Sequence, residues 1–295
     1  MNISAKKDNT CMTEAPTLVP LGLAGGQGKT TLALMTGRLL ARYGISVLFV
    51  DADPQASMTA FLGVTPDEDR PTLLEVIVQP EKKVPLYSAI QPVPNSEHLF
   101  VIPANDQLEN ANHHLAASAI SLNLLRNRLY QVGEKLDHQD LVAHNFGIII
   151  VDPPPERSHL ALTSLGAGNL WAIPAEANVK GVRSLLRTME LIQTYQSLLP
   201  NGQFIGVMPF RARWVGLHPT STTKQSMQVM EEVAGANKML PHLLESDVYK
   251  RAINDQVLPR DLGHPDLEYP LLALIERIKP VLGDAAKLIE VGEVA

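Results

Sequence analysis

The sequence predicts an α/β fold with three layers, in which a mostly parallel, twisted sheet has helices on both faces. Short apolar runs alternate along the chain with longer runs of helical period, which is typical of parallel strands joined by crossover helices. Two of the short runs end at an aspartate, and the first leads directly into a glycine-rich turn. With 295 residues, 45% of them hydrophobic, the chain is long enough to bury the core of one large domain.

Six short apolar runs are predicted to be strands, at residues 18–23, 46–50, 99–102, 146–151, 170–174 and 204–208. Helical periodicity predicts helices over residues 29–43, 111–136, 182–192 and 219–233, and a last helix near residues 269–278. Gly44 is placed to end the first helix, and Pro280 to interrupt the last. Pro20 lies inside the first predicted strand, where a proline removes a ladder hydrogen bond, so we expect a local bulge there.

We expect a flexible N-terminal tail over residues 1–16, followed by a single domain over residues 17–295. The prolines within residues 64–98 indicate a surface excursion rather than a linker between domains. No apolar run approaches the ~20 residues needed to cross a bilayer, and the start does not resemble a signal peptide. The single cysteine, Cys11, excludes an internal disulfide framework and a cysteine-ligated cluster within one chain, which suits a reducing cytoplasm.

A glycine-rich turn lies between the first predicted strand and the first predicted helix, and it reads Gly25-Gly26-Gln27-Gly28-Lys29-Thr30-Thr31. Glycines allow the backbone to curl so that successive N–H groups point at an anion, and the helix N-terminus adds its positive end. In such a turn Lys29 would reach the β- and γ-phosphates of a nucleotide, and the Thr30 hydroxyl would bind Mg²⁺. The alternative is a plain glycine turn before an ordinary helix, but the position between strand and helix favours a phosphate-binding loop.

The strict phosphate-loop spacing G-x-x-x-x-G-K-[ST] is not met, because Leu23 stands where its first glycine would be. The turn instead resembles the deviant Walker A box, K-G-G-x-G-K-[ST]-T, of the ParA/MinD ATPases. Two further segments resemble motifs of that family in the same order. The segment Val50-Asp51-Ala52-Asp53-Pro54-Gln55 is similar to its D-x-D-P-Q motif, and Ile149-Ile150-Val151-Asp152-Pro153-Pro154 to its Walker B strand end. The resemblance covers roughly residues 17–260, favours ParA over MinD, and implies a P-loop ATPase with ATP and Mg²⁺ as cofactors.

The same resemblance implies roles for three aspartates. Asp53 matches the residue that positions the attacking water, and Asp51 matches the carboxylate near the Mg²⁺ shell. Asp152 matches the Walker B carboxylate, which often acts through water. Such roles suit phosphoryl transfer, which depends on positioning and charge neutralisation more than on covalent catalysis.

The nucleobase in this fold sits near the ends of later strands. Pro209, Phe210 and Arg211 follow or end the predicted strand at residues 204–208, so they are candidates for contact with adenine. The alternative, which the sequence favours equally, is that these residues are an ordinary strand end whose aromatic side chain packs in the core.

ParA-type ATPases sandwich two ATP molecules in a dimer, and a signature lysine just before the glycines crosses to the other subunit's nucleotide. Here that position is Ala24, which cannot neutralise phosphate charge. Three explanations stay open: Lys180 supplies the cation, Arg157 supplies it, or the site dimerises weakly or works slowly. We favour Lys180 as the catalytic cation, because the pattern resembles the carboxysome-positioning branch, McdA, which uses a lysine from the later half of the chain. An ordinary solvated lysine is the alternative.

The net charge of −6 argues against a generally basic nucleic-acid-binding surface, although it leaves room for a local basic patch. The resemblance implies non-specific binding of nucleoid DNA through contacts to phosphates. Lys250 and Arg251 match the basic position of the family, and Arg260 and Arg213 are further candidates. The alternative is that these basic residues lie at a solvent-exposed helix end and bind no DNA.

The resemblance thus implies a cytoplasmic, nucleoid-associated ATPase that hydrolyses ATP slowly, forms an ATP-dependent homodimer and positions a carboxysome through a small McdB-like or ParB-like adaptor. Plasmid-partition ParA is the close alternative, and only Ala24 separates the two. A membrane-positioning MinD-like ATPase needs a basic amphipathic helix at its C-terminus, whereas residues 288–295 are acidic, so no membrane contact is expected. A ligase of the cobyrinic acid synthase type needs a second functional half, for which the chain offers neither room nor a cysteine nucleophile.

Overall fold

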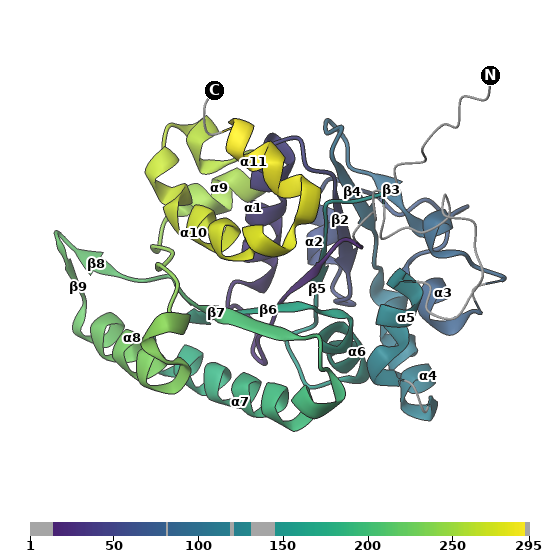
Figure 1. Cartoon of the computed structure of the whole chain (residues 1–295), viewed down its shortest axis with the longest axis horizontal. Helices are drawn as coiled ribbons and strands as arrows, with labels where there is room; N and C mark the ends of the chain where they lie inside the picture. The colour runs from purple at the N-terminus through teal and green to yellow at the C-terminus, as the bar shows by residue number, and fades with distance from the viewer. Residues whose placement is uncertain (1–13, 81, 119–120, 131–144, 293–295) are drawn as a thin grey trace, which may run out of the picture.

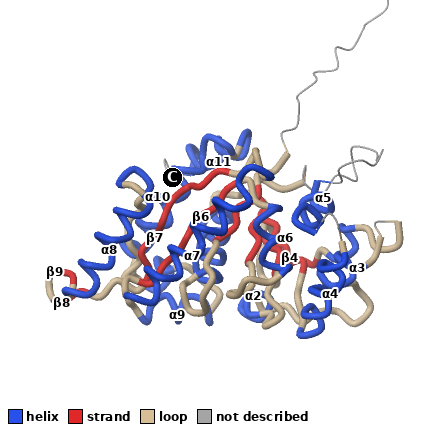
Figure 2. Tube along the Cα trace, turned by 90° about the horizontal axis from the view of Figure 1, so that it is seen from below, coloured by secondary structure: helices blue, strands red, loops and turns tan. Residues whose placement is uncertain are grey.

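The computed structural model describes residues 14–80, 82–118, 121–130 and 145–292. A seven-stranded sheet lies between two layers of helices, so the predicted three-layer α/β fold is confirmed (Figure 1, Figure 2). The strands of this sheet are β1 Thr17–Pro20, β2 Val47–Asp51, β3 Gln91–Pro92, β4 Leu99–Ile102, β5 Ile148–Asp152, β6 Leu170–Glu176 and β7 Gln203–Phe210. A separate hairpin, β8 Trp214–Val215 and β9 His218–Pro219, projects from the body beyond the end of β7 (Figure 1).

The order of strands across the sheet is β3-β4-β2-β5-β1-β6-β7. The neighbouring strands are parallel except for β3 and β4, which are antiparallel. Asp51, the last residue of β2, lies directly opposite Asp152, the last residue of β5. Because β1 is the other neighbour of β5, the glycine-rich turn that follows β1 starts at the same edge. The sheet therefore brings all three predicted motifs to the carboxyl ends of adjacent strands.

Helices cover both faces of the sheet. They are α1 Lys29–Arg42, α2 Ser57–Phe61, α3 Leu73–Val78, α4 Ala111–Ala117, α5 Leu124–Tyr130, α6 His159–Ala167, α7 Val179–Tyr195, α8 Ser221–Ala234, α9 Asp247–Asn254, α10 Tyr269–Ile278 and α11 Ala286–Gly292. Buried side chains of α1, α2, α9, α10 and α11 join one core, and those of α3 to α8 join the other. Among the described residues, no helix is both long and apolar enough to cross a membrane.

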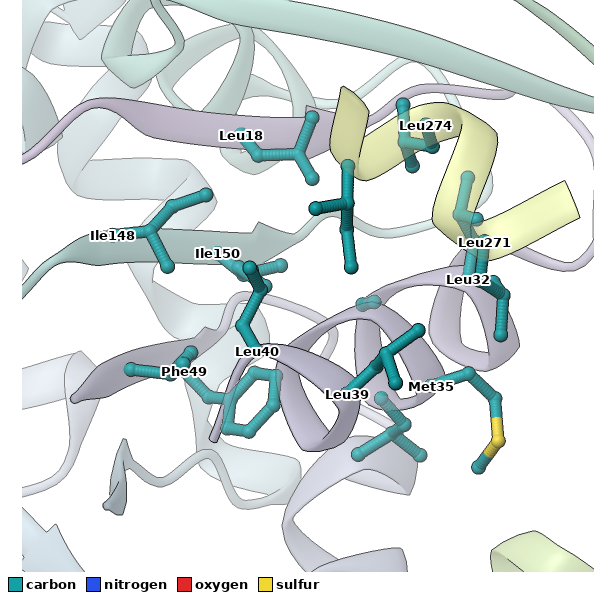
Figure 3. Close-up of a cluster of buried hydrophobic side chains, with 14 of the residues drawn as sticks. Leu18, Leu32, Met35, Leu39, Leu40, Phe49, Ile148, Ile150, Leu271 and Leu274 are labelled. Atoms are coloured by element: carbon teal, nitrogen blue, oxygen red, sulfur yellow. The ribbon is translucent and has the colours of Figure 1, made fainter. Parts of the chain in front are cut away.

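Successive strand residues alternate between the two cores, as the pleat of a strand requires. In β5, Ile148 and Ile150 belong to the core on the α1 side, whereas Ile149 and Val151 belong to the core on the opposite face. Figure 3 shows Ile148 and Ile150 facing the leucines of α1 and α10. Both faces of this central strand are buried, which explains why its sequence is apolar throughout.

Pro20 is the last residue of β1 and needs no bulge. The pairing of β1 with β5 runs through Thr17 and Leu18, so that ladder has ended before the position at which Pro20 would donate. On the other side the ladder continues past the proline, because the N–H of Leu21 donates to the carbonyl of Ala172 at 2.8 Å. The prediction of a local bulge at Pro20 is therefore wrong.

The predicted helix over residues 111–136 is also wrong as one element. Helix α4 ends at Ala117, and Ser118 adopts an extended conformation with ψ of 128°. The chain re-enters a helix at α5, where the N–H of Leu125 donates to the Thr163 hydroxyl of α6. Apolar residues on both pieces face the same core, so their shared period concealed the break. The end of the predicted helix, residues 131–136, lies outside the described residues.

Residues 64–98 are not a surface excursion. The segment contains α3, a 3₁₀ turn at Leu86–Ala89 and the edge strand β3, and its apolar side chains Leu73, Val76 and Ile77 are buried in the core. The prolines punctuate this segment without removing it from the fold. Five helices, α2, α3, α6, α9 and α11, have no counterpart among the predicted helices, and α11 follows the helix expected to be the last. Residues 1–13 of the expected tail lie outside the described residues, whereas Ala15 is buried.

Candidate nucleotide-binding site

The glycine-rich turn forms one wall of a cavity of about 220 Å³ at the carboxyl edge of the sheet. Gly26 and Gly28 have positive φ angles of 79° and 97°, a conformation that L side chains rarely adopt. A Cβ atom on Gly28 would also come within 2.8 Å of the Phe210 ring. The cavity is lined by Gly25, Gly26, Gln27, Gly28, Lys29, Thr30, Thr31, Asp53, Ser57, Pro155, Phe210 and Arg211. The structure thus gathers the predicted loop, one of the three aspartates and two of the three predicted base contacts around one space.

Lys29 begins α1 and is only 7% exposed. Burial lowers the pKa of its amine, and the nearby carboxylates of Asp152 and Asp53 offset part of that decrease. A buried ammonium group requires negative partners, and the phosphates of a nucleotide held in the loop would add to these two. The position of Lys29 therefore fits the predicted contact with phosphate.

The hydroxyl of Thr30 donates a hydrogen bond of 2.6 Å to Oδ2 of Asp152. Asp152 is 1% exposed, and its second oxygen, Oδ1, has no hydrogen-bond partner among the described residues. Burial raises the pKa of Asp152 to about 7; Asp51 adds to the increase, while the Thr30 hydroxyl and the Lys29 ammonium oppose it. A buried carboxylate with a free oxygen beside a hydroxyl is a donor set that Mg²⁺, or water bound to it, would satisfy.

Asp51 is fully buried and already bound by its own chain. Its Oδ2 accepts hydrogen bonds from the N–H and the hydroxyl of Thr59 at 2.8 and 2.7 Å, and its Oδ1 accepts from the N–H of Asp53 at 3.3 Å. Burial raises the pKa of Asp51 to about 6, although the hydrogen bonds from Thr59 oppose the increase. Asp51 therefore shapes the turn that presents Asp53 to the cavity. Asp53 lines the cavity directly, and its Oδ1 accepts from the N–H of Gln55 at 3.0 Å.

The residues present fit a magnesium nucleotide. The loop offers main-chain N–H groups and the start of α1, and Lys29 offers a cation for the terminal phosphates. Thr30 and the unpartnered oxygen of Asp152 are the oxygen donors that would hold the ion. When bound, Mg²⁺ would neutralise charge on the phosphates.

Phe210 and Arg211 also line a second cavity, of about 190 Å³, which shares Thr31 with the first. This cavity has both polar and apolar lining residues, which further include Leu244, Glu245, Ser246, Asp247, Tyr249, Lys250 and Ile253. Its aromatic and aliphatic part could receive a nucleobase. Pro209 is buried one residue earlier in β7 and lines neither cavity.

Several residues that the fold brings to this region were not predicted from the sequence, among them Ser57, Pro155, Thr59 and Tyr249. Ser57 and Pro155 line the first cavity, and each lies just beyond a segment that resembles a family motif, so extending those segments would have found them. Thr59, which holds Asp51, and Tyr249, which lines the second cavity, lie in no motif. Only tertiary packing places these two.

Lys180 reaches the loop of its own chain. Its Nζ donates to the carbonyl of Gly25 at 2.9 Å, beside Ala24, the position that lacks the signature lysine. Asn178 fixes the start of α7, because its Oδ1 accepts from the N–H of Gly181 at 3.0 Å. Arg157 is exposed and makes no hydrogen bond or ion pair with the described residues. Of the two candidates, the fold brings Lys180 to the loop.

The predicted DNA-binding residues differ in their surroundings. Arg251 is exposed, whereas Lys250 lines the second cavity and pairs with Asp247 at 2.9 Å. Arg260 is bound to the fully buried Glu268 at 2.6 Å, so its guanidinium is part of the packing of this region. Arg213 makes two hydrogen bonds, of 2.6 and 3.1 Å, to Glu245, which raise its pKa. Arg251 is thus the candidate most open to an external phosphate.

Comparison with known proteins agrees with this geometry. A family model described as an AAA domain matches residues 21–199. The chain is 40% identical to the maintenance of carboxysome distribution protein A of Gloeothece citriformis, over 90% of this chain and 96% of the relative. It is 39% identical to the protein of the same name from Synechococcus elongatus, over 89% of this chain and 98% of the relative. The solved ATP complex of McdA from Cyanothece superposes with a TM-score of 0.82 at 38% identity, covering 90% of this chain and 97% of that one.

The order of the three motifs, their meeting at one edge of the sheet and this similarity along nearly the whole length lead to one conclusion. The chain belongs to the ParA/MinD family of deviant Walker A ATPases, in which it is similar to the maintenance of carboxysome distribution A proteins.

Proposed function

We propose that the chain is a nucleoid-bound ATPase that positions carboxysomes. In this proposal it forms an ATP-dependent sandwich dimer, binds DNA without sequence preference, and meets a small adaptor that stimulates slow hydrolysis. The observation that carries the proposal is the hydrogen bond between Thr30 and Asp152 beside the buried Lys29, because this arrangement would suit a magnesium ion and the phosphates of a nucleotide at the loop. The similarity to two carboxysome distribution proteins supports the cargo.

The residues of the cavity divide the work of phosphoryl transfer among them. The loop N–H groups and Lys29 bind the terminal phosphates and neutralise their charge. Thr30 and Asp152 would hold the magnesium ion, which would neutralise charge on the phosphates. Asp53, which lines the cavity, orients the water that attacks the γ-phosphate. Lys180 moves from Gly25 of its own chain to the nucleotide of the second chain and takes the place of the missing lysine at Ala24.

Plasmid partition is the second candidate function. It is supported by the Asp51-Ala52-Asp53-Pro54-Gln55 segment and by 30% identity to a probable plasmid-partitioning ParA of Thermus thermophilus, over 74% of this chain. Deleting the gene from its own host separates the two cargoes. Clustered carboxysomes with normal plasmid inheritance support carboxysome positioning, whereas plasmid loss with evenly spaced carboxysomes supports partition.

The ATPase assignment is tested with two substitutions in the same cavity. Asp53→Ala should bind Mg-ATP within about threefold of the wild-type affinity, yet its single-turnover hydrolysis should fall by about 100-fold or more, because the attacking water loses its orienting group. Lys29→Ala should lose measurable ATP binding by calorimetry. Normal hydrolysis by Asp53→Ala would reject the role of Asp53, and normal ATP binding by Lys29→Ala would reject the site.

A further inference from the structure

Every second residue of the loop, at positions 23, 25 and 27, forms a hydrogen bond with β6 or α7. The N–H of Leu23 donates to the hydroxyl of Thr188 at 3.2 Å. The carbonyl of Gly25 accepts from Lys180 at 2.9 Å. The side chain of Gln27 accepts, through Oε1, from the N–H of Glu176 at 3.0 Å. The loop is therefore attached along its length to the helix that bears Lys180.

Gln27 makes the contact nearest the phosphate-binding glycines. Its side chain is 0% exposed although it belongs to a loop that borders a cavity, so the amide is turned into the protein toward the end of β6. Its second polar atom, Nε2, is buried and has no hydrogen-bond partner among the described residues. Leaving an amide donor unpaired costs free energy, so an apolar side chain of the same length would pack here with less penalty. What the amide provides in return is the acceptor for Glu176.

Glu176 fixes the start of α7 through its own main chain. Its carbonyl packs so closely against Gly181 that a Cβ atom there would lie 1.9 Å away. Its carboxylate pairs with Arg211 at 3.3 Å, and the Arg211 guanidinium lies over the Phe210 ring, 5.4 Å from its centroid. The contacts thus run from Gln27 through Glu176 to both the start of α7 and the end of β7.

We propose that Gln27 is a positioning residue that couples the phosphate-binding loop to Lys180. The hydrogen bond to Glu176 holds the start of α7 in register with the loop, so that a change of the loop on binding phosphate is passed to the helix that presents Lys180. The proposal rests on the role proposed for Lys180 between two chains. It adds that the placement of Lys180 depends on the amide at position 27.

The test is a double-mutant cycle with Gln27→Met, which removes the acceptor and keeps the length of the side chain, and Lys180→Met. Gln27→Met alone should lower the ATP-dependent dimer fraction about tenfold by light scattering, with each variant measured at a concentration of Mg-ATP that saturates it. At protein concentrations high enough for the Lys180→Met variant to form a measurable dimer, adding Gln27→Met should have no further effect on dimerisation, because the cation that it positions is gone. The matched control, Gln225→Met on the exposed face of α8, should leave the dimer unchanged.

The outcomes separate this proposal from the one on which it rests. If Lys180→Met alone leaves the dimer intact, the role of Lys180 fails and this coupling fails with it. If Lys180→Met disrupts the dimer but the effects of the two substitutions multiply, only the coupling is overturned, and Gln27 has a purely structural role. Gln27→Leu, which removes the same acceptor with a smaller side chain, tests the coupling should Gln27→Met not fold; an unchanged dimer in that variant would overturn the proposal.

Discussion

Asp51 and Asp152 stand directly opposite each other as the last residues of two adjacent strands, and both are buried. Burial raises the pKa of each carboxyl, to about 6 for Asp51 and to about 7 for Asp152, and the charge of Asp51 adds to the increase at Asp152. Two carboxylates so placed resist full ionisation together. A magnesium ion beside Thr30 would supply the charge that allows both to ionise.

Magnesium affinity should therefore depend on pH near neutrality. Because Asp152 must lose its proton to bind the ion, the affinity for Mg²⁺ in the presence of ATP should be about tenfold weaker at pH 6 than at pH 8. Binding at pH 7 should release protons, which calorimetry in buffers of different ionisation enthalpy measures directly.

The control for this dependence is Asp152→Asn, which cannot titrate. It should bind Mg²⁺ more weakly than the wild type at pH 8 and show little change in affinity between pH 6 and pH 8. A variant that keeps the full pH dependence would place the titrating group elsewhere.

The sequence predicted the carboxyl ends of the central strands better than it predicted the segments outside the centre of the sheet. Three strands lead to the site: one precedes the loop, one ends at Asp51 and one ends at Asp152. These strands are buried on both faces, so their apolar runs and the residues that follow or end them can be recognised in the sequence alone. The segment at residues 64–98 was misread because its prolines outweighed the apolar residues between them, which α3 buries. Local pattern says little about where a short helix docks.

The contacts between the loop and the later half of the chain could not be predicted in the same way. Gln27 and Glu176 are 149 positions apart, and only the pairing of β1 with β6 brings them together. Arg260 is a related case, since its charge predicted DNA contact, and the sequence could not show that Glu268 pairs with it within the fold. Charge in a sequence does not show whether a partner already neutralises it.

The contact of Lys180 with Gly25 leads to a prediction for assembly. Lys180→Ala should bind ATP within about threefold of the wild-type affinity, because its amine contacts a loop carbonyl of its own chain and does not line the nucleotide cavity. It should lose the ATP-dependent dimer, since the second chain's phosphates would lack a cation. Sizing chromatography in the presence of ATP separates monomer from dimer, and an unchanged dimer would exclude this role of Lys180. Arg157→Ala is the control and should leave the dimer intact.

The surroundings of the basic residues separate DNA binding from folding. Lys250→Ala/Arg251→Ala should weaken ATP-dependent DNA binding in a gel shift and reduce the slope of log affinity against log salt by about 2, because two phosphate contacts are lost. Arg251→Ala alone tests the residue that lies away from the second cavity.

Arg260→Ala should act differently from those two residues. It leaves Glu268 buried without its ion-pair partner, so we expect a loss of about 3 kcal/mol in the free energy of unfolding, measured by urea denaturation. DNA binding by the folded fraction should be unchanged. Retained binding in the Lys250→Ala/Arg251→Ala pair, or lost binding in a stable Arg260→Ala variant, would move the DNA-binding surface.

The packing of Phe210 against Gly28 predicts which loop glycines tolerate a methyl group. Gly28→Ala places a Cβ atom 2.8 Å from the Phe210 ring at a φ of 97°, so strain and overlap should together lower the free energy of unfolding by about 2 kcal/mol or more. Gly25→Ala, whose Cβ atom would meet nothing within 4 Å, should leave stability within about 0.5 kcal/mol of the wild type.

Combining Gly28→Ala with Phe210→Ala separates the two sources of that loss. Removing the ring abolishes the overlap but not the strain of a positive φ, so the double variant should lose less stability than the sum of the single variants. Thermal unfolding without nucleotide measures all four proteins under one condition. Strictly additive losses would show that the ring does not constrain the loop, and Phe210 would then be free to move when a nucleobase enters the neighbouring cavity.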